Sequence, residues 1–451
     1  MSVPKKFKIL RFCRSMLTDK ATRMTALTVV LSGLLTVAVK ALGFARELLM
    51  AFYFGVSETI DNYVLVILAV TFVVAPVSGS FSTLITPRYI QFNDKKRLYG
   101  AASLFQKTLL LITLFVIVIE SLQLLLLTLL PAAWTSRLTI LFESYWIALM
   151  TIALFSGIST VVGGVLMGQG RVKTYTCLPA TVSITVIASL VLFSSTNLLM
   201  ALILGTVAGF AFETIANLTA VRHLLLVSRS KLRSANDDFS GMLAKMPMLV
   251  GSAIIMNACI IVDQVMAVMA GPGSVAAVSF GSRLSIGLIS VAAVIWVVLY
   301  PVFSRLVAQN NLKQLRRQMI QNVILIIVVG VPICGSIAYF STEFTRLLFE
   351  RGAFDSNATS TVSQIQMFYV LHIPLYVVVM VCMRVVNAFQ NNLSLVVANL
   401  MSLSLNVIFN LLFIEWMGVV GIAMATLVAY SFMAIYWMVL ANKLITTHQQ
   451  A

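Results

Sequence analysis

Three cationic side chains lie in or at the ends of long apolar stretches of the sequence: Lys40, Arg46 and Arg283. A charged group at the centre of a bilayer costs about 2.5 to 3.5 kcal/mol on insertion scales, so such groups usually face a protein interior or a water-filled cavity. Guanidinium groups match phosphate oxygens with paired hydrogen bonds. These residues therefore predict an anion site in a central cavity, and diphosphate is the anion that fits them best.

A second interpretation of the same cations stays open. Arg46 is close in sequence to Glu47 and Asp61, so an ordinary ion pair at the membrane interface would also explain it. Lys40 could extend its ammonium group to the membrane surface. Arg283 lies about two turns inside its apolar run, so a position at the membrane surface explains it less well. The choice between an interior and a surface position is equally open for two acids in apolar runs, Glu120 and Glu213.

A second group of polar residues differs in chemistry because it contains no cation. Asp263 lies in one apolar run, Asn406 and Asn410 are spaced i,i+4 on one face of another, and Thr426 lies in a third. One carboxylate with several neutral oxygens suits a small hard cation such as Na+, or a proton on Asp263. Alternatively, the two Asn residues only join neighbouring helices.

The elements that must position these side chains are membrane-spanning helices. Of the 451 residues, 60% are hydrophobic and 10% are charged, whereas soluble domains carry about 25% charged residues. A spanning helix needs about 20 mostly apolar residues, and twelve runs qualify. We therefore predict an all-α, multi-pass membrane protein. The predicted spans are Met24–Phe44, Val64–Ile85, Leu109–Leu130, Tyr145–Met167, Tyr175–Phe193, Leu198–Ala220, Met246–Ala270, Val275–Phe303, Ile320–Phe340, Met367–Phe389, Leu393–Phe413 and Val419–Leu440.

The distribution of cations predicts the orientation of these spans. There are 31 Lys and Arg residues against 15 Asp and Glu, a net charge of +16. Most of the cations fall on the N-terminal side of the membrane, which the positive-inside rule makes cytoplasmic, so both termini are predicted to be cytoplasmic. Residues 1–23 are predicted to form a basic segment at the membrane surface. In a membrane protein this excess favours contact with anionic lipids rather than with nucleic acid.

A weak internal repeat predicts how the spans are grouped. The pattern Glu47-x2-Met50-Ala51-x3-Gly55 returns 216 residues later as Asp263-x2-Met266-Ala267-x3-Gly271. Six spans return the chain to its starting side, so a duplicated unit gives two halves of the same orientation. We predict two six-helix bundles around a shared central cavity, residues 24–230 and 246–451, joined by a cytoplasmic linker over residues 231–245.

The sequence contains no enzyme signature. It lacks a Walker loop, GxSxG and HExxH, and it offers no carboxylate pair with a plausible active site outside the membrane. The five Cys and three His residues are too scattered to suggest a disulfide framework or a metal site. We therefore expect a protein that is not an enzyme and needs no cofactor, with H+ or Na+ coupling as the open possibility.

Several blocks of residues resemble the MurJ (MviN) lipid II flippase family. That family belongs to the MOP superfamily, which also includes the Wzx saccharide flippases and the MATE exporters. The resemblance covers nearly the whole chain and is most specific after the ninth span. The matching blocks are LGFARE at 42–47, FG at 54–55, TID at 59–61, DQVMAVMAG at 263–271, SRL at 282–284, YP at 300–301, RLLFERGAF at 346–354 and GVVGIA at 418–423.

The resemblance implies roles for some of these residues. Arg46 and Arg283 are expected to bind the diphosphate of a polyprenyl-linked saccharide in the central cavity, where the position of Lys40 in its apolar run also places that residue. Asp61 and Glu47 are expected at the cavity or its outer gate. Residues 76–79 read PVSG where the family carries paired arginines, residues 285–287 read SIG where an acid is common, and the sequence ends after twelve spans where members that flip lipid II have fourteen. An exopolysaccharide or O-antigen unit is therefore as good a substrate as lipid II.

The resulting prediction is a flippase of the bacterial inner membrane that works by alternating access. Its partners would be an undecaprenyl-diphosphate-linked saccharide, membrane lipids and envelope polysaccharide synthesis enzymes. One alternative is a MATE-type cation-coupled drug exporter, against which the cationic bias argues. The other is a non-transporting scaffold for envelope polysaccharide synthesis.

Overall fold

The computed structural model describes residues 20–94, 98–129, 132–193, 198–227, 239–389 and 391–450. Within these ranges the chain is built from helices and turns and contains no strand. Most of the predicted basic surface segment, residues 1–23, and about half of the predicted linker, residues 231–245, lie outside the described ranges. The predicted all-α class is thus confirmed for the part of the chain that is described.

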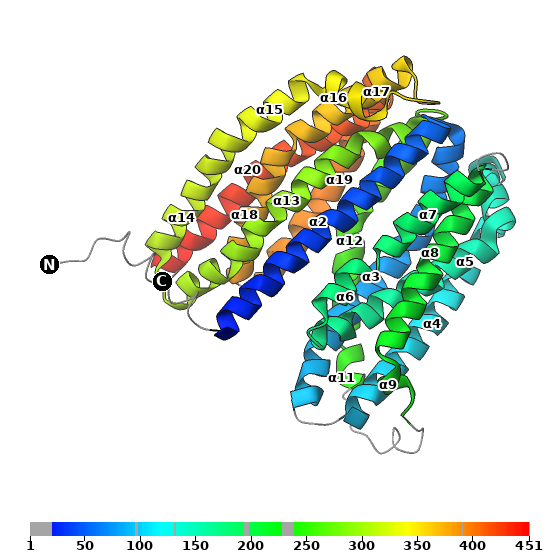
Figure 1. Ribbon diagram of the computed structural model, residues 1–451. Coiled ribbons are helices and arrows are strands. Elements are labelled where there is room, and N and C mark those ends of the chain that lie inside the picture. Colours follow the sequence, from blue (N-terminus) through cyan, green and yellow to red (C-terminus); the bar gives the residue numbers. More distant parts are fainter. Residues whose placement is uncertain are drawn as a thin grey trace. The chain divides into compact units, whose positions relative to one another are not determined.

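The helices group into two compact units, coloured by sequence in Figure 1. The first unit comprises residues up to Arg46 together with Val77–Met246, and the second comprises Glu47–Pro76 and Pro247–Ala451. Two long helices, α2 and α3, contribute to both units. The first unit and its shared helices comprise α2 (Lys20–Phe54), α3 (Glu58–Asp94), α4 (Leu98–Leu129), α5 (Ala132–Gly168), α6 (Val172–Cys177), α7 (Ala180–Leu192), α8 (Leu198–Ala220), α9 (Arg222–Leu225) and α11 (Phe239–Leu243).

The second unit holds most of the candidate site. Between α13 and α16, the helices α14 and α15 form one continuous helical segment in which a short π-helix, η1, joins them. Its elements are α12 (Met246–Met269), α13 (Ser274–Ala308), α14 (Leu312–Leu325), η1 (Ile326–Gly330), α15 (Val331–Tyr339), α16 (Ser341–Phe349), α17 (Ser356–Leu371), α18 (Ile373–Ala388), α19 (Asn392–Met417) and α20 (Val420–Gln450).

Eleven helical segments in the described ranges are long and apolar enough to cross a membrane. Each of them overlaps one of the predicted spans from the second to the twelfth, and α2 covers the first, Met24–Phe44. Many large apolar side chains on these helices are exposed, for example Ile147, Val291 and Leu393. Exposed apolar surface of this kind suits contact with lipid tails. The chain is a multi-pass membrane protein.

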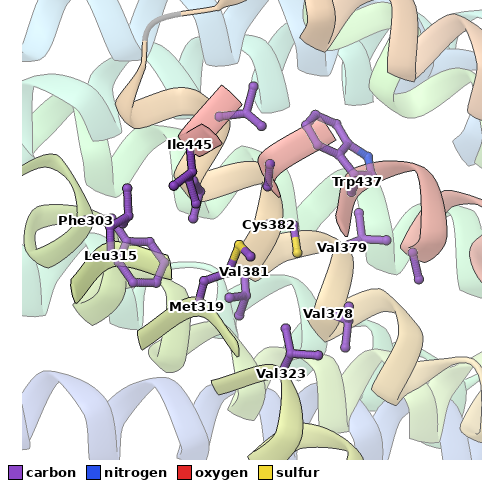
Figure 2. Close-up of a cluster of buried hydrophobic side chains, with 14 of the residues drawn as sticks. Phe303, Leu315, Met319, Val323, Val378, Val379, Val381, Cys382, Trp437 and Ile445 are labelled. Atoms are coloured by element: carbon purple, nitrogen blue, oxygen red, sulfur yellow. The ribbon is translucent and has the colours of Figure 1, made fainter. Parts of the chain in front are cut away.

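A tightly packed apolar cluster holds the second unit together at one end. Figure 2 shows Phe303 from α13, Met319 from α14, Val381 and Cys382 from α18, and Trp437 from α20 meeting in one group. All of these side chains are at most 2% exposed. The cluster fixes the spacing of helices that also carry polar groups of the candidate site.

In the first unit a polar network joins α5 to α8. Ser159 donates a hydrogen bond of 2.6 Å to the Glu213 carboxylate and accepts one of 2.8 Å from Asn217. Glu213 is therefore an interior residue. Glu120 on α4 is fully buried as well, and among the described residues neither of its oxygens has a hydrogen-bond partner. The interior position is thus the one that the structure shows for both acids.

The predicted division into bundles at residues 24–230 and 246–451 stays a prediction. In the structure, Glu47–Pro76 group with the second unit although they belong to the N-terminal half of the sequence. Of the equivalent positions in the sequence repeat, Ala51 and Ala267 are both fully buried, and the repeat itself also stays a prediction.

Candidate functional site

The centre of the candidate site is an ion pair between Arg283 on α13 and Glu47 on α2. The Nη2 atom of Arg283 lies 3.3 Å from Oε2 of Glu47 and donates a hydrogen bond of 3.0 Å to Ser279, one turn earlier on α13. Glu47 is 4% exposed, whereas the Arg283 side chain is 32% exposed. The acid is thus buried, the arginine is partly exposed, and the contact between them orients the guanidinium group.

This geometry leaves part of the guanidinium group available. Arg carries five N–H donors in a planar fork, and both contacts of Arg283 use Nη2. Its Nε atom is buried and has no hydrogen-bond partner among the described residues, so an oxyanion would have to bind the other donors of this partly exposed side chain. An arginine that is oriented by an acid on one edge and has donors left on the other can bind an oxyanion in two-pronged fashion.

The other two predicted anion-binding residues lie in the first unit. Lys40 is exposed on α2, and Arg46, at the end of the part of α2 that belongs to that unit, is half-buried. Arg46 directly precedes Glu47 in the chain, and Glu47 contacts Arg283. The sequence offers Arg46 as an ion-pair partner for Glu47, but it does not predict Arg283 in that role.

Asp61, predicted at an outer gate, acts in the structure as a helix cap supplied from a distance. The first residue before α13 is Gly273, which has no side chain to accept the backbone donors at the helix start. Asp61 on α3 fills this role, because its carboxylate accepts hydrogen bonds of 2.6 Å from the Gly273 amide and 2.7 Å from the Ala276 amide. Asp61 is 1% exposed, and its negative charge also suits the positive end of the helix dipole.

The loop after α16 is fastened to the C-terminal end of α2. The Ala353 amide donates a hydrogen bond of 2.9 Å to the Phe52 carbonyl. Gly352 has φ +62°, and a Cβ atom there would collide with the same carbonyl oxygen. Behind the loop, Phe349 and Phe354 stack on each other with ring centroids 5.6 Å apart. The RLLFERGAF block thus serves to hold residues 52–55 against the rest of the second unit.

This contact gives a first prediction. Gly352→Ala is expected to lower the thermal unfolding midpoint, because the new Cβ would collide with the Phe52 carbonyl and because φ +62° disfavours a residue with a side chain. Gly170→Ala is the matched control, since Gly170 has a similar φ of +71° but a Cβ added there would have nothing within 4 Å. Differential scanning fluorimetry in detergent should show the larger decrease for Gly352→Ala; equal decreases would mean that the close approach has no energetic role.

The predicted cation cluster is brought together in the second unit. Oδ1 of Asp263 on α12 accepts hydrogen bonds from Asn406 at 2.9 Å and from Asn410 at 2.8 Å, both on α19. Thr426 on α20 lies 3.4 Å from Oδ2 and donates to the Ile422 carbonyl at 3.1 Å. Three helices therefore converge on one carboxylate. Whether this cluster binds a cation stays a prediction.

A cavity of about 230 Å³ opens beside this carboxylate. Its walls include an aromatic group that the sequence analysis does not predict: His372, whose ring centroid lies 5.3 Å from that of Tyr430, with Tyr369 and Tyr376 next to it. A lone histidine forms no ligand pattern, so the sequence alone gives His372 no role. The i,i+3 and i,i+4 spacing of 369, 372 and 376 along one helix face is the signal that could reveal the group.

The sequence matches a known protein family over most of its length. The model of the family described as "Lipid II flippase MurJ" matches residues 50–451. A "Probable lipid II flippase MurJ" of Synechocystis sp. is 28% identical over 156 residues, which are 34% of this chain and 29% of that protein. The "Lipid II flippase MurJ" of Thermosipho africanus is 32% identical over 100 residues, 22% of this chain and 21% of that protein. The aligned segments thus span less than a third of these relatives.

Solved structures share the fold over nearly the whole chain. A lipid II flippase MurJ in an inward closed conformation superposes with a TM-score of 0.75 at 20% identity, covering 92% of this chain and 87% of that one. An inward-facing multidrug resistance transporter of the MATE family, also in the MOP superfamily, gives a TM-score of 0.71 at 12% identity, covering 93% and 99%. At these identities the likeness establishes the fold, which is that of the MOP superfamily.

Proposed function

Since the chain belongs to the MurJ lipid II flippase family, we propose that it moves a polyprenyl-diphosphate-linked saccharide across the bacterial inner membrane. The saccharide unit is that of lipid II or of a related exopolysaccharide or O-antigen precursor. The protein performs no chemical conversion, so it is a transporter and not an enzyme.

The observation that carries this proposal is the contact that Arg283 makes with Glu47 and the partial exposure of its side chain. Its guanidinium group contacts the buried Glu47 carboxylate, and the arginine side chain is 32% exposed, so part of it is open to an oxyanion. Diphosphate is the part of the substrate that every member of this substrate class shares, so a fixed arginine gives recognition that does not depend on the sugar. Arg46, adjacent to Glu47 in the chain, and Lys40 supply further positive charge.

In this mechanism two six-helix bundles, residues 24–230 and 246–451, open a central cavity to each side of the membrane in turn. Both termini and the 231–245 linker are on the cytoplasmic side. The cap that Asp61 provides to α13 and the contact between Phe52 and Ala353 belong to the outer gate in its closed form. The lipid tail stays among membrane lipids, and enzymes of envelope polysaccharide synthesis supply the substrate and use the product.

The cluster around Asp263 is proposed to bind the coupling ion, Na+. The two amide groups need only a half-turn about their last bond to present oxygens instead of N–H groups. The site would then offer oxygens from Asp263, Asn406, Asn410 and Thr426 with the Ile422 carbonyl nearby. Such a set suits a hard cation. A proton on Asp263 is the alternative.

The ion proposal predicts sodium-dependent stability. Replacing KCl by NaCl at constant ionic strength should raise the thermal unfolding midpoint of the wild-type protein by a few degrees, because a ligand that binds only the folded state stabilises it. Asp263→Asn should abolish this increase, whereas Asp355→Asn, which changes an exposed acid at the start of α17, should preserve it. An equal midpoint of the wild-type protein in both salts would contradict sodium binding and favour the proton.

The transport proposal is tested with purified protein in liposomes that contain labelled lipid-linked saccharides. We expect protein-dependent movement of the labelled headgroup to the opposite leaflet. A drug exporter of the MATE type would instead move cationic dyes, and a scaffold would move neither. Absence of headgroup movement for lipid II and for an O-antigen precursor alike would contradict the proposal.

A further inference from the structure

The cavity next to Asp263 adjoins a second one that has a different lining. This second cavity, of about 240 Å³, shares five lining residues with the first, and its remaining wall includes the apolar side chains of Met380, Met383, Met433 and Trp437. Both lie wholly in the second unit. Sites for drug-sized molecules measure about 300 to 1,000 Å³. Each cavity alone falls short of that size, but the two together reach it. The shared residues are Cys259, Ile260, Tyr376, Ser402 and Tyr430.

The charge of this paired cavity has one sign. Asp263 is the acid among the described lining residues, and these include no Lys or Arg. The other titratable groups that line the cavity with Asp263 are the Cys259 thiol from α12, Tyr369 from α17, His372 before α18, Tyr376 from α18 and Tyr430 from α20. An ionised carboxylate in such surroundings favours a cationic ligand, since the described lining offers no Lys or Arg to neutralise it.

The walls favour an organic cation over a hydrated metal ion in the larger space. The rings of Tyr376 and Tyr430 meet with centroids 5.5 Å apart, and His372 lies 6.3 Å from Tyr376 and 5.3 Å from Tyr430. Aromatic faces attract cations whose charge is spread over an apolar body. The Met side chains beyond them are flexible and polarizable, and they fit apolar groups of varied shape.

We infer that these two cavities form one binding site for a lipophilic monovalent organic cation, with its positive centre at the Asp263 end and its apolar body among Tyr430, Tyr376 and the Met residues. This inference rests on the proposed function in one respect, because Asp263 is also the residue proposed to hold sodium. The organic cation and Na+ would then compete for one carboxylate. The site is separate from Arg283, which borders neither cavity.

The probe for this site is tetraphenylphosphonium, measured by equilibrium dialysis against the purified protein in detergent with KCl as the only salt. We expect saturable binding with one site per chain. Asp263→Asn should weaken it at least tenfold, and Tyr430→Leu about fivefold through loss of an aromatic face. Tyr436→Leu is the matched control, because Tyr436 lies on the same helix, α20, but lines neither cavity; it should bind as the wild-type protein does.

The two proposals that involve Asp263 fail in different ways. Tyr430→Leu should lose affinity for the phosphonium ion and keep the stabilisation by Na+. Binding that does not saturate, or equal affinity in the wild-type, Asp263→Asn and Tyr430→Leu proteins, would overturn the inference even if Na+ stabilises the protein. Saturable binding that depends on Tyr430, without any effect of Na+, would instead overturn the sodium proposal and leave this inference standing.

Discussion

Replacement of Arg283 by Ala is expected to abolish complementation of a flippase-deficient bacterial strain while the protein level in the membrane stays normal. The loss removes the donors proposed to bind the diphosphate, and translocation should decrease at least about 30-fold, as for other truncated charge pairs that cost about 2 to 5 kcal/mol. Arg305→Ala is the matched control, because Arg305 is exposed near the end of the same helix. Normal polymer export by the Arg283 variant would contradict the role of this residue.

Two further variants separate binding from simple misfolding. Arg283→Ala removes the guanidinium group that contacts the buried Glu47 carboxylate, which is itself destabilising. The double variant Glu47→Gln with Arg283→Ala removes that buried charge, so it should recover stability but not transport. Arg283→Lys keeps the charge but loses the planar fork, and it should retain only part of the activity. Recovery of transport in the double variant would mean that Arg283 serves only to neutralise Glu47.

Asp61→Ala should produce the largest loss of stability of all these substitutions. It leaves the Gly273 and Ala276 amides without their acceptor in a buried position. Each unsatisfied donor costs about 1 to 3 kcal/mol, and water that enters the site offsets part of this cost, so we expect a loss of about 3 kcal/mol in the free energy of unfolding.

The matched control is Asp355→Ala, which removes an exposed cap whose carboxylate accepts a hydrogen bond of 2.8 Å from Ala358 at the start of α17. This substitution should cost about 1 kcal/mol. Thermal unfolding of both variants in detergent checks the difference. Equal unfolding midpoints would mean that the cap supplied by the distant Asp61 stabilises the protein no more than the local cap supplied by Asp355.

The parts of this protein that could be predicted from sequence are those with a local signal. Apolar runs of about 20 residues specify spanning helices directly, because a bilayer allows few other structures. The i,i+4 spacing of Asn406 and Asn410 places both on one face of a helix, and the structure brings that face to Asp263. Polar residues in apolar runs need polar partners inside the protein, which limits the helix arrangements that are possible.

Pairings between distant segments leave no such signal. Asp61 and Gly273 are 212 residues apart, and nothing in either segment specifies the other. The grouping of Glu47–Pro76 with the second unit follows from contacts of this kind, which an equal division of the sequence does not reveal. Likewise, the sequence does not predict that His372 belongs to an aromatic group, because the group forms only through contact with Tyr430 from another helix.

The most direct test of diphosphate recognition compares two substrates in the same proteoliposomes: one saccharide linked to the polyprenyl chain by a diphosphate and the same saccharide linked by a monophosphate. Because recognition is assigned to Arg283 and the diphosphate, the wild-type protein should move the first lipid and leave the second in its original leaflet, and Arg283→Ala should move neither. Movement of both lipids at equal rates, with Arg283 or without it, would contradict recognition of the substrate through this arginine.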